Sequence, residues 1–155
     1  MYVKATVIAD HPVRESIAAL LDDAEAWFPH LIESAGERSG THLAAVGFTL
    51  AGVPLQMHVQ VELGPIRHEL DWLRVGVSWR PASAAAMFPS MDGEFHLEPN
   101  TYRDTRVTVS GTYAPPLGLA GRGLDVALLH RVAEATFKDL ASTIAAELDH
   151  RLAAR

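Results

Sequence analysis

The sequence predicts an α+β fold in which a curved antiparallel sheet wraps around a long C-terminal helix. The chain begins with a strand-like segment, its middle alternates between apolar and polar residues, and everything after Asp125 has the spacing of one amphipathic helix. Its 155 residues, of which 48% are hydrophobic and 21% charged, are typical of one globular domain. A chain of this length can bury a core without disulfides or metal ions. We therefore expect a single domain over residues 1–155.

The first third of the chain predicts one strand and two short helices. Residues 2–9 read as a strand, and the sequence DHP at 10–12 provides a polar cap and a proline that start a helix over 13–21. Residues 24–31 have the spacing of a second short helix. Pro29 is expected to bend or end this helix, because proline removes a backbone donor.

The middle of the chain predicts antiparallel strands. From Thr41 onward the pattern changes to period two, with Val46, Phe48 and Leu50 on one face. Trp72 interrupts the later alternation, which indicates a bulge or an exposed aromatic side chain, and it hints at a homodimer or partner face. Residues 82–87 are either a short edge strand or a loop. The remaining predicted strands span residues 55–63, 69–80, 91–98 and 102–112.

The C-terminal segment predicts one long helix, with Asp125 as its N-cap. One apolar stripe follows the helical period. His130 falls near this stripe, so we expect it on the buried face. It is then either a core histidine bonded to a backbone carbonyl or a group that contacts a ligand. The stripe consists of Val126, Leu129, Ala133, Phe137, Leu140, Ile144 and Leu148.

Composition narrows the classes of function. The formal net charge is -6 and the arginines are scattered, which argues against a nucleic-acid partner. No apolar run is long enough for a transmembrane helix, so stable membrane insertion is not expected. The sequence contains no cysteine, and no signal peptide is visible at its start, so we expect a cytoplasmic protein.

The sequence lacks the common motifs of catalysis and cofactor binding. Its eight histidines show no spacing that suits one metal ion, so we expect no metal. Gly118, Gly121 and Gly123 match neither the dinucleotide-binding pattern nor a phosphate-binding loop, so they make turns or a lid. Ser110 lacks the surroundings of a serine nucleophile. We therefore expect no cofactor.

Some local stretches carry a resemblance to a known superfamily. These are IADHPV (8–13) with Leu21, Asp22 and Trp27 downstream, SGTYAPPLG (110–118) and LHRVA (129–133). Together with the order of elements along the whole chain, they resemble the START-like, helix-grip superfamily (SRPBCC). It includes lipid-transfer domains, polyketide cyclases and aromatases, and plant pathogenesis-related ligand binders. The resemblance implies a sheet that grips the last helix around an apolar cavity.

The predicted inner positions mix large and small residues, as a ligand cavity requires. Gly47, Gly111 and Ala133 would leave space. Arg80 and Arg122 either meet an anionic head group at the cavity mouth or are simply solvated. The candidate ligand-binding residues are Phe48, Met57, Trp79, Phe95, Tyr113, His130, Phe137 and Arg80.

Three functions remain open. The first is binding or transport of a hydrophobic or amphipathic small molecule, such as a lipid, a polyketide or an aromatic metabolite, and we expect this rather than an enzyme. The second is a polyketide cyclase or aromatase that uses His130, Tyr113 or Arg80 to polarise carbonyls and move protons. The third is a protein-interaction module, which predicts a filled cavity and an apolar surface patch.

Overall fold

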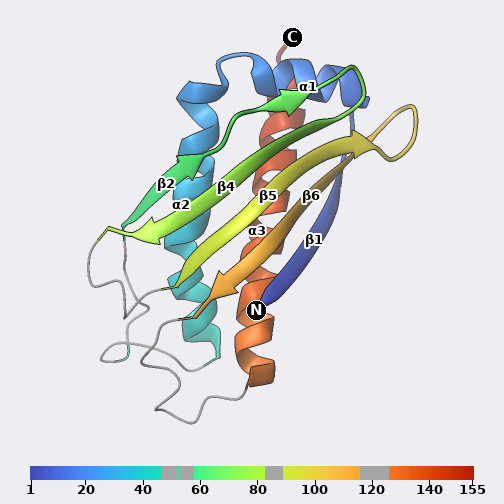
Figure 1. Cartoon of the computed structure of the whole chain (residues 1–155). Helices are drawn as coiled ribbons and strands as arrows, with labels where there is room; N and C mark the ends of the chain where they lie inside the picture. The colour runs from blue at the N-terminus through green and yellow to red at the C-terminus, as the bar shows by residue number, and fades with distance from the viewer. Residues whose placement is uncertain (47–51, 53–57, 83–88, 116–125) are drawn as a thin grey trace.

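A six-stranded antiparallel sheet and three helices form the protein in a computed structural model that describes residues 1–46, 52, 58–82, 89–115 and 126–155. The strands pair in the order β1-β6-β5-β4-β2, and the short β3 pairs with β4 (Figure 1). The elements are β1 (Tyr2–Ala9), α1 (Val13–Leu21), α2 (Ala24–Ala45), β2 (Val59–Leu63), β3 (Arg67–His68), β4 (Leu73–Pro81), β5 (Ser90–Pro99), β6 (Thr105–Ala114) and α3 (Val126–Ala153).

The sheet and the two long helices enclose one apolar core. Figure 1 shows α2 and α3 side by side on one face of the sheet, with α1 at one end. On β4 the side chains of Leu73, Val75, Val77 and Trp79 are all buried, as the alternation predicts. The structure confirms the predicted α+β, helix-grip fold.

Two facing glycines bring β5 and β6 unusually close. Gly93 pairs with Gly111, and a Cβ atom at Gly93 would lie 2.6 Å from the backbone oxygen of Ser110. A Cβ atom at Gly111 would collide with the carbonyl of Asp92. Only glycine fits such an approach, and glycine inside a strand often marks a bend. Gly111, which the sequence predicts as a small inner residue, therefore acts together with Gly93 to allow the close approach of β5 and β6.

The second helix is much longer than predicted. It runs on past Pro29 to Ala45, so the prediction that it ends near residue 31 is wrong. The prediction of a strand from Thr41 is also wrong for residues 41–45, because these residues belong to the helix. Its second half buries small residues, among them Ala35, Gly36 and Gly40. Tertiary packing of this small face outweighs the single backbone hydrogen bond that proline removes. Phe48 and Leu50 lie outside the described residues.

Two predicted strands begin later than expected because turns precede them. The backbone N–H of Glu69 donates to the carbonyl of Trp72 at 2.9 Å, and β4 begins only at Leu73. Trp72 is half-buried, with the guanidinium of Arg74 5.8 Å from its ring centroid. In the turn before β6, the Asp104 carboxylate accepts a hydrogen bond from the backbone N–H of Thr101 at 2.9 Å.

The last helix carries the predicted stripe with one exception. Every stripe residue from Leu129 to Leu148 is buried, but Val126 at its start is 72% exposed. Asp125 and most of residues 82–87 lie outside the described residues. None of the helices in the described part of the chain is long and apolar enough to cross a membrane.

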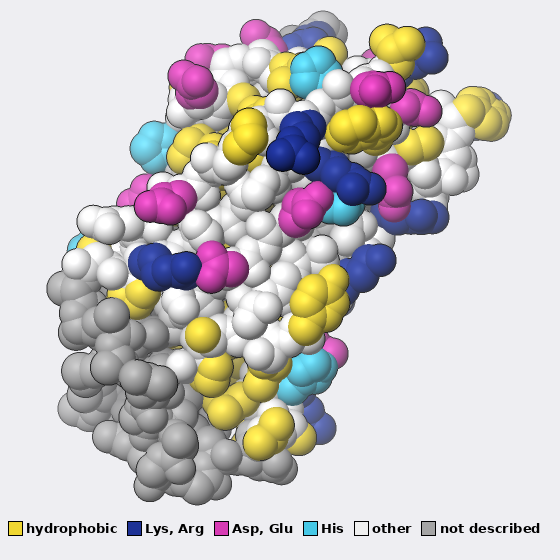
Figure 2. Space-filling view, in the orientation of Figure 1, with side chains coloured by type: hydrophobic (Ala, Val, Ile, Leu, Met, Phe, Trp, Pro, Cys, Tyr) yellow, Lys and Arg dark blue, Asp and Glu magenta, His cyan; other side chains and the backbone are white. Residues whose placement is uncertain are grey.

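The outer face of the sheet is polar. Acidic and basic side chains are interspersed on it, as Figure 2 shows. Arg106 pairs with Glu98 across β6 and β5 at 3.3 Å, and His96 lies 2.6 Å from Glu94. His58 is 90% exposed, as predicted, whereas the His96 side chain is only 24% exposed and its Nε2 is buried.

Candidate functional site

One end of the core gathers buried polar side chains. β4 and β6 finish there, β5 starts there, and the C-terminal part of α2 covers them (Figure 1). We call this region, defined by Ser39, Trp79, Met91 and Tyr113, the Tyr113 end. The opposite region, around Ser16, Phe28, Phe95 and Thr105, is called the α1 end. The two regions share the same inner face of the sheet but differ in their chemistry.

Three side chains form one row across the sheet at the Tyr113 end. Trp79 on β4 pairs with Met91 on β5, and Met91 pairs with Tyr113 on β6. Trp79 and Tyr113 are fully buried and Met91 is 1% exposed. The alternation of each strand places all three on the inner face. The sequence prediction of Trp79 and Tyr113 as inward-facing residues is therefore correct.

Helix α2 lies directly on this row. A Cβ atom at Gly36 would be 3.1 Å from Cδ2 of Trp79 and 3.1 Å from Cγ2 of Val59. Glycine at this position lets the helix backbone approach the indole ring closely. Ser39 follows about one helical turn later and is also fully buried. The small residues of α2 thus allow the Ser39 hydroxyl to lie close to the row of strand side chains.

The polar atoms at the Tyr113 end have few partners among the described residues. The Trp79 indole nitrogen is buried without a hydrogen bond from any described residue, and the Ser39 and Tyr113 hydroxyls lie close to each other but have no further described partner. Burial raises the pKa of Tyr113 far above its ordinary value, and the nearby Ser39 hydroxyl opposes that rise only in part. A buried polar group without a partner costs about 1–3 kcal/mol, so such a cluster is uncommon.

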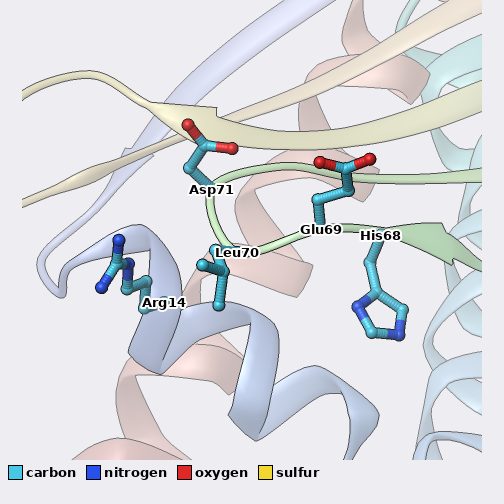
Figure 3. Close-up of a pocket in the computed structure, with 5 residues that line it drawn as sticks. All are labelled: Arg14, His68, Glu69, Leu70 and Asp71. Atoms are coloured by element: carbon cyan, nitrogen blue, oxygen red, sulfur yellow. The ribbon is translucent and has the colours of Figure 1, made fainter.

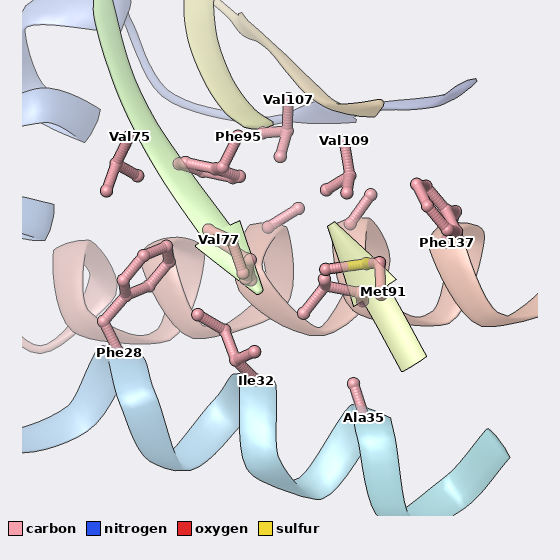
Figure 4. Packing of buried hydrophobic residues seen from close by; sticks show 14 of the residues in the cluster. Phe28, Ile32, Ala35, Val75, Val77, Met91, Phe95, Val107, Val109 and Phe137 are labelled. Atoms are coloured by element: carbon pink, nitrogen blue, oxygen red, sulfur yellow. The ribbon is translucent and has the colours of Figure 1, made fainter. Parts of the chain in front are cut away.

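The surroundings of the cluster are apolar. Figure 4 shows Met91 from β5 and Phe137 from α3 at the same end of the core, with Ala35 of α2 below Met91. Phe137 and Ala35 are fully buried. A few placed polar groups inside an apolar lining are the usual composition of a small-molecule site.

Phe95 belongs to the other end of the core. Its ring centroid lies 5.3 Å from that of Phe28, and both side chains are fully buried. In Figure 4 Phe28 and Val75 lie at one side of the cluster, away from Phe137. Phe95 is thus tightly packed in the core. Met57 and Phe48 fall outside the described residues.

His130 is not on the buried face of α3, and this prediction is wrong. Its side chain is 46% exposed, and its Nε2 lies 3.1 Å from the carboxylate of Glu134. The buried face begins at Leu129 and continues with Val132 and Ala133, so His130 is rotated by about 100° toward solvent. The prediction placed His130 on the buried face because it lies close to Val126 around the helix, and Val126 is itself exposed.

Arg80 lies on the outer face of the sheet. Its guanidinium binds the Asp92 carboxylate through two hydrogen bonds of 2.8 and 3.0 Å, and its side chain is 53% exposed. The neighbouring residue Trp79 points to the inner face. Arg80 and Tyr113 therefore lie on opposite faces of the sheet.

The described surface has shallow depressions that do not gather a comparable set of groups. One of about 460 Å³ is lined by Arg14, His68, Glu69, Leu70 and Asp71. Figure 3 shows the carboxylates of Glu69 and Asp71 on the other side of the turn from His68 and Leu70. Because these groups diverge, they do not form a binding site. In the described part of the chain no group of three or more potential ligands could hold a metal ion.

Comparisons with known proteins agree on the fold and establish no function for this chain. No family model and no curated protein matches the sequence. A conserved protein from Geobacillus kaustophilus superposes with a TM-score of 0.60 at 14% identity, over 97% of this chain and 96% of that one. A hypothetical protein from Helicobacter pylori gives 0.55 at 10% identity, over 95% and 87% of the two chains. These similarities show the fold alone.

An aromatase/cyclase from Streptomyces sp. R1128 also matches over 98% of this chain and 95% of its own, at 12% identity. Its TM-score is 0.42, and this superposition is too loose to inform the function of the chain.

Proposed function

We propose that the protein binds a hydrophobic or amphipathic small molecule at the Tyr113 end, between the sheet and helices α2 and α3. The observation that carries this proposal is the cluster of three buried polar side chains, Ser39, Trp79 and Tyr113, that lack hydrogen-bond partners outside the cluster among the described residues. Folding without a partner for these groups would cost several kcal/mol in total, at about 1–3 kcal/mol for each group. A ligand that supplies the missing hydrogen bonds would remove that cost.

The observed geometry favours binding over the cyclase alternative. A cyclase requires polar groups that converge on one substrate and exchange protons near neutral pH. Of the three residues expected for this role, His130 and Arg80 are exposed and paired with Glu134 and Asp92. Burial raises the pKa of Tyr113, so its hydroxyl keeps its proton. No general base therefore faces Tyr113 from the positions that the sequence suggested.

The interaction-module alternative is supported less well. That function predicts a continuous apolar patch on the surface. The large exposed apolar side chains of the described residues are spread over different elements: Tyr2 and Ile8 on β1, Leu21 on α1, Leu70 and Tyr102 in turns, and Val126 on α3. Single exposed apolar side chains of this kind are normal on protein surfaces.

The proposal is tested with a neutral apolar fluorescent probe, N-phenyl-1-naphthylamine. We expect saturable binding with one probe for each chain, and at least tenfold weaker binding by Trp79→Ala. Trp72→Ala is the matched control, because Trp72 lies in a turn outside the proposed site. Native mass spectrometry of the mildly purified protein should also show a co-purifying apolar molecule. Absence of both saturable binding and a co-purifying molecule would contradict the proposal, as would unchanged affinity in a folded Trp79→Ala variant.

A further inference from the structure

The Tyr113 end has buried hydrogen-bond donors that no described residue outside the cluster satisfies. The Trp79 indole can only donate, whereas the hydroxyls of Ser39 and Tyr113 can each donate and accept. If one hydroxyl rotates to donate to the other, the proton of the second hydroxyl and the indole proton have no acceptor among the described residues. The chemistry that completes this site is therefore an acceptor.

The described residues at this end supply no charged group to the site. The basic residues Arg38 and His42 on α2 face α3 instead. Arg38 Nε lies 2.8 Å from the Asp139 carboxylate and its NH2 group donates to Thr143 at 3.1 Å. His42 Nε2 lies 3.7 Å from the same carboxylate. A buried anion needs a cation or several strong donors to offset its desolvation, so this site does not suit an ionised carboxylate or phosphate.

These two observations define the chemical class of the ligand. Resting on the function proposed above, we propose that the ligand is a neutral, largely apolar molecule whose carbonyl-type oxygen accepts hydrogen bonds from Trp79 and Tyr113. A carbonyl oxygen has two lone pairs and accepts two such bonds. Ser39 then pairs with Tyr113 and fixes the direction in which the phenol donates. Met91 and Phe137 provide the apolar contacts for the rest of the molecule.

The role of Tyr113 as a donor is insensitive to pH in the physiological range. Burial raises the pKa of its hydroxyl, and the phenol therefore remains protonated throughout that range. Ligand binding through Tyr113 should accordingly show no change between pH 6 and 9, roughly the range over which exposed histidine and the α-amino group titrate. If Tyr113 instead bound a cation as a phenolate, the binding would strengthen as the pH rises.

Three rigid compounds of similar shape test the proposed ligand class by displacement of N-phenyl-1-naphthylamine. They are 9-fluorenone, which carries a neutral carbonyl, fluorene, which carries no oxygen, and fluorene-9-carboxylate, which is an anion. We expect 9-fluorenone to bind at least tenfold more tightly than fluorene, and the carboxylate to bind most weakly. In Tyr113→Phe the preference for 9-fluorenone over fluorene should fall at least fivefold while the affinity for fluorene stays unchanged. Tyr102→Phe is the matched control, because Tyr102 is 80% exposed.

The outcomes separate this inference from the proposed function. Equal affinities for 9-fluorenone and fluorene would overturn the inference and keep the binding function, since ordered water would then satisfy the donors. Tightest binding of the carboxylate would also overturn it. Failure of all three compounds to displace the probe would contradict a ligand site at the Tyr113 end. A preference for 9-fluorenone that survives in Tyr113→Phe would remove Tyr113 from the site, and Trp79→Phe would then show whether the indole alone donates.

Discussion

Ser16 and Thr105 at the α1 end and Ser39 and Tyr113 at the Tyr113 end are all fully buried, but their polar atoms are treated differently. At the α1 end the Thr105 hydroxyl donates to the carbonyl of His11 at 2.6 Å and lies 3.0 Å from the Ser16 hydroxyl. At the Tyr113 end the corresponding hydroxyls have no described partner other than each other. The contrast is that described residues satisfy the buried hydroxyls of the α1 end, whereas no described residue accepts from the Trp79 indole at the Tyr113 end. The proposed function explains this difference, because a ligand would supply the acceptor.

The largest effect is expected from the packing of the α1 end. Phe28→Ala should reduce the free energy of unfolding by about 3–5 kcal/mol, because a buried aromatic ring is replaced by a cavity. Phe28 is fully buried and its ring contacts Phe95. Equilibrium urea denaturation measures the change, with Tyr102→Ala as the exposed control that should stay within about 0.5 kcal/mol. A loss below about 1 kcal/mol for Phe28→Ala would show that this end is not the tightly packed one.

A smaller effect is expected from the hydrogen bonds of the α1 end. Thr105→Val keeps the shape of the side chain but removes the hydrogen bonds of the Thr105 hydroxyl with the His11 carbonyl and the Ser16 hydroxyl, which then keep only their mutual contact of 3.4 Å. The free energy of unfolding should fall by about 1–3 kcal/mol in the same urea experiment. Thr112→Val provides the control, since Thr112 lies on the same strand and is exposed. If Thr105→Val and Thr112→Val lowered the free energy of unfolding by the same amount, the buried hydrogen bonds of Thr105 would not contribute to the stability of the α1 end.

A pH-dependent effect is expected where α2 and α3 meet near the Tyr113 end. Partial burial works to raise the pKa of Asp139, but the contacts from His42 and Arg38 outweigh it and hold the pKa below its ordinary value of 3.8. The stabilisation is therefore present above pH 3.8 and is lost as the pH falls through the folded-state pKa. Asp139→Asn should lower the free energy of unfolding by roughly 0.2–1 kcal/mol at pH 7.

The stability difference between wild type and Asp139→Asn should shrink as the pH is lowered below 3.8. Thermal unfolding monitored by circular dichroism between pH 3 and 7 measures it. A difference that stays constant over this range would exclude an electrostatic role for Asp139.

The sequence was sufficient for the inner faces of β4 and β5 but not for the strand expected from Thr41 or for the polar side of the site. On β4 and β5 the alternation is regular, so Trp79 and Phe95 could be placed on the inner face from the pattern alone. Ser39 was missed because the second half of α2 buries glycine, alanine and serine, whose weak hydrophobic signal does not reveal a helix. Only the close approach of Gly36 to Trp79 in the fold explains why these small residues are there.

The misplacement of His130 has a different cause. A helical stripe identifies a buried face only if its reference residues are themselves buried, and Val126 is not. A one-position error in a helix turns a side chain by about 100°, which is enough to move it from the core to solvent. Residues whose role depends on the angle around a helix are therefore less predictable than residues on alternating strands.

Tyr113→Phe tests the central contrast most directly, because it removes the buried phenol hydroxyl, which has no described partner other than the Ser39 hydroxyl, and keeps the aromatic ring. The measurement is the free energy of unfolding of the ligand-free protein, with Tyr102→Phe as the exposed control. Loss of a buried hydroxyl without a partner should leave the stability unchanged or raise it by up to about 1 kcal/mol. A loss of more than about 1 kcal/mol would show that the hydroxyl already has a partner within the protein, and the Tyr113 end would then be complete without a ligand.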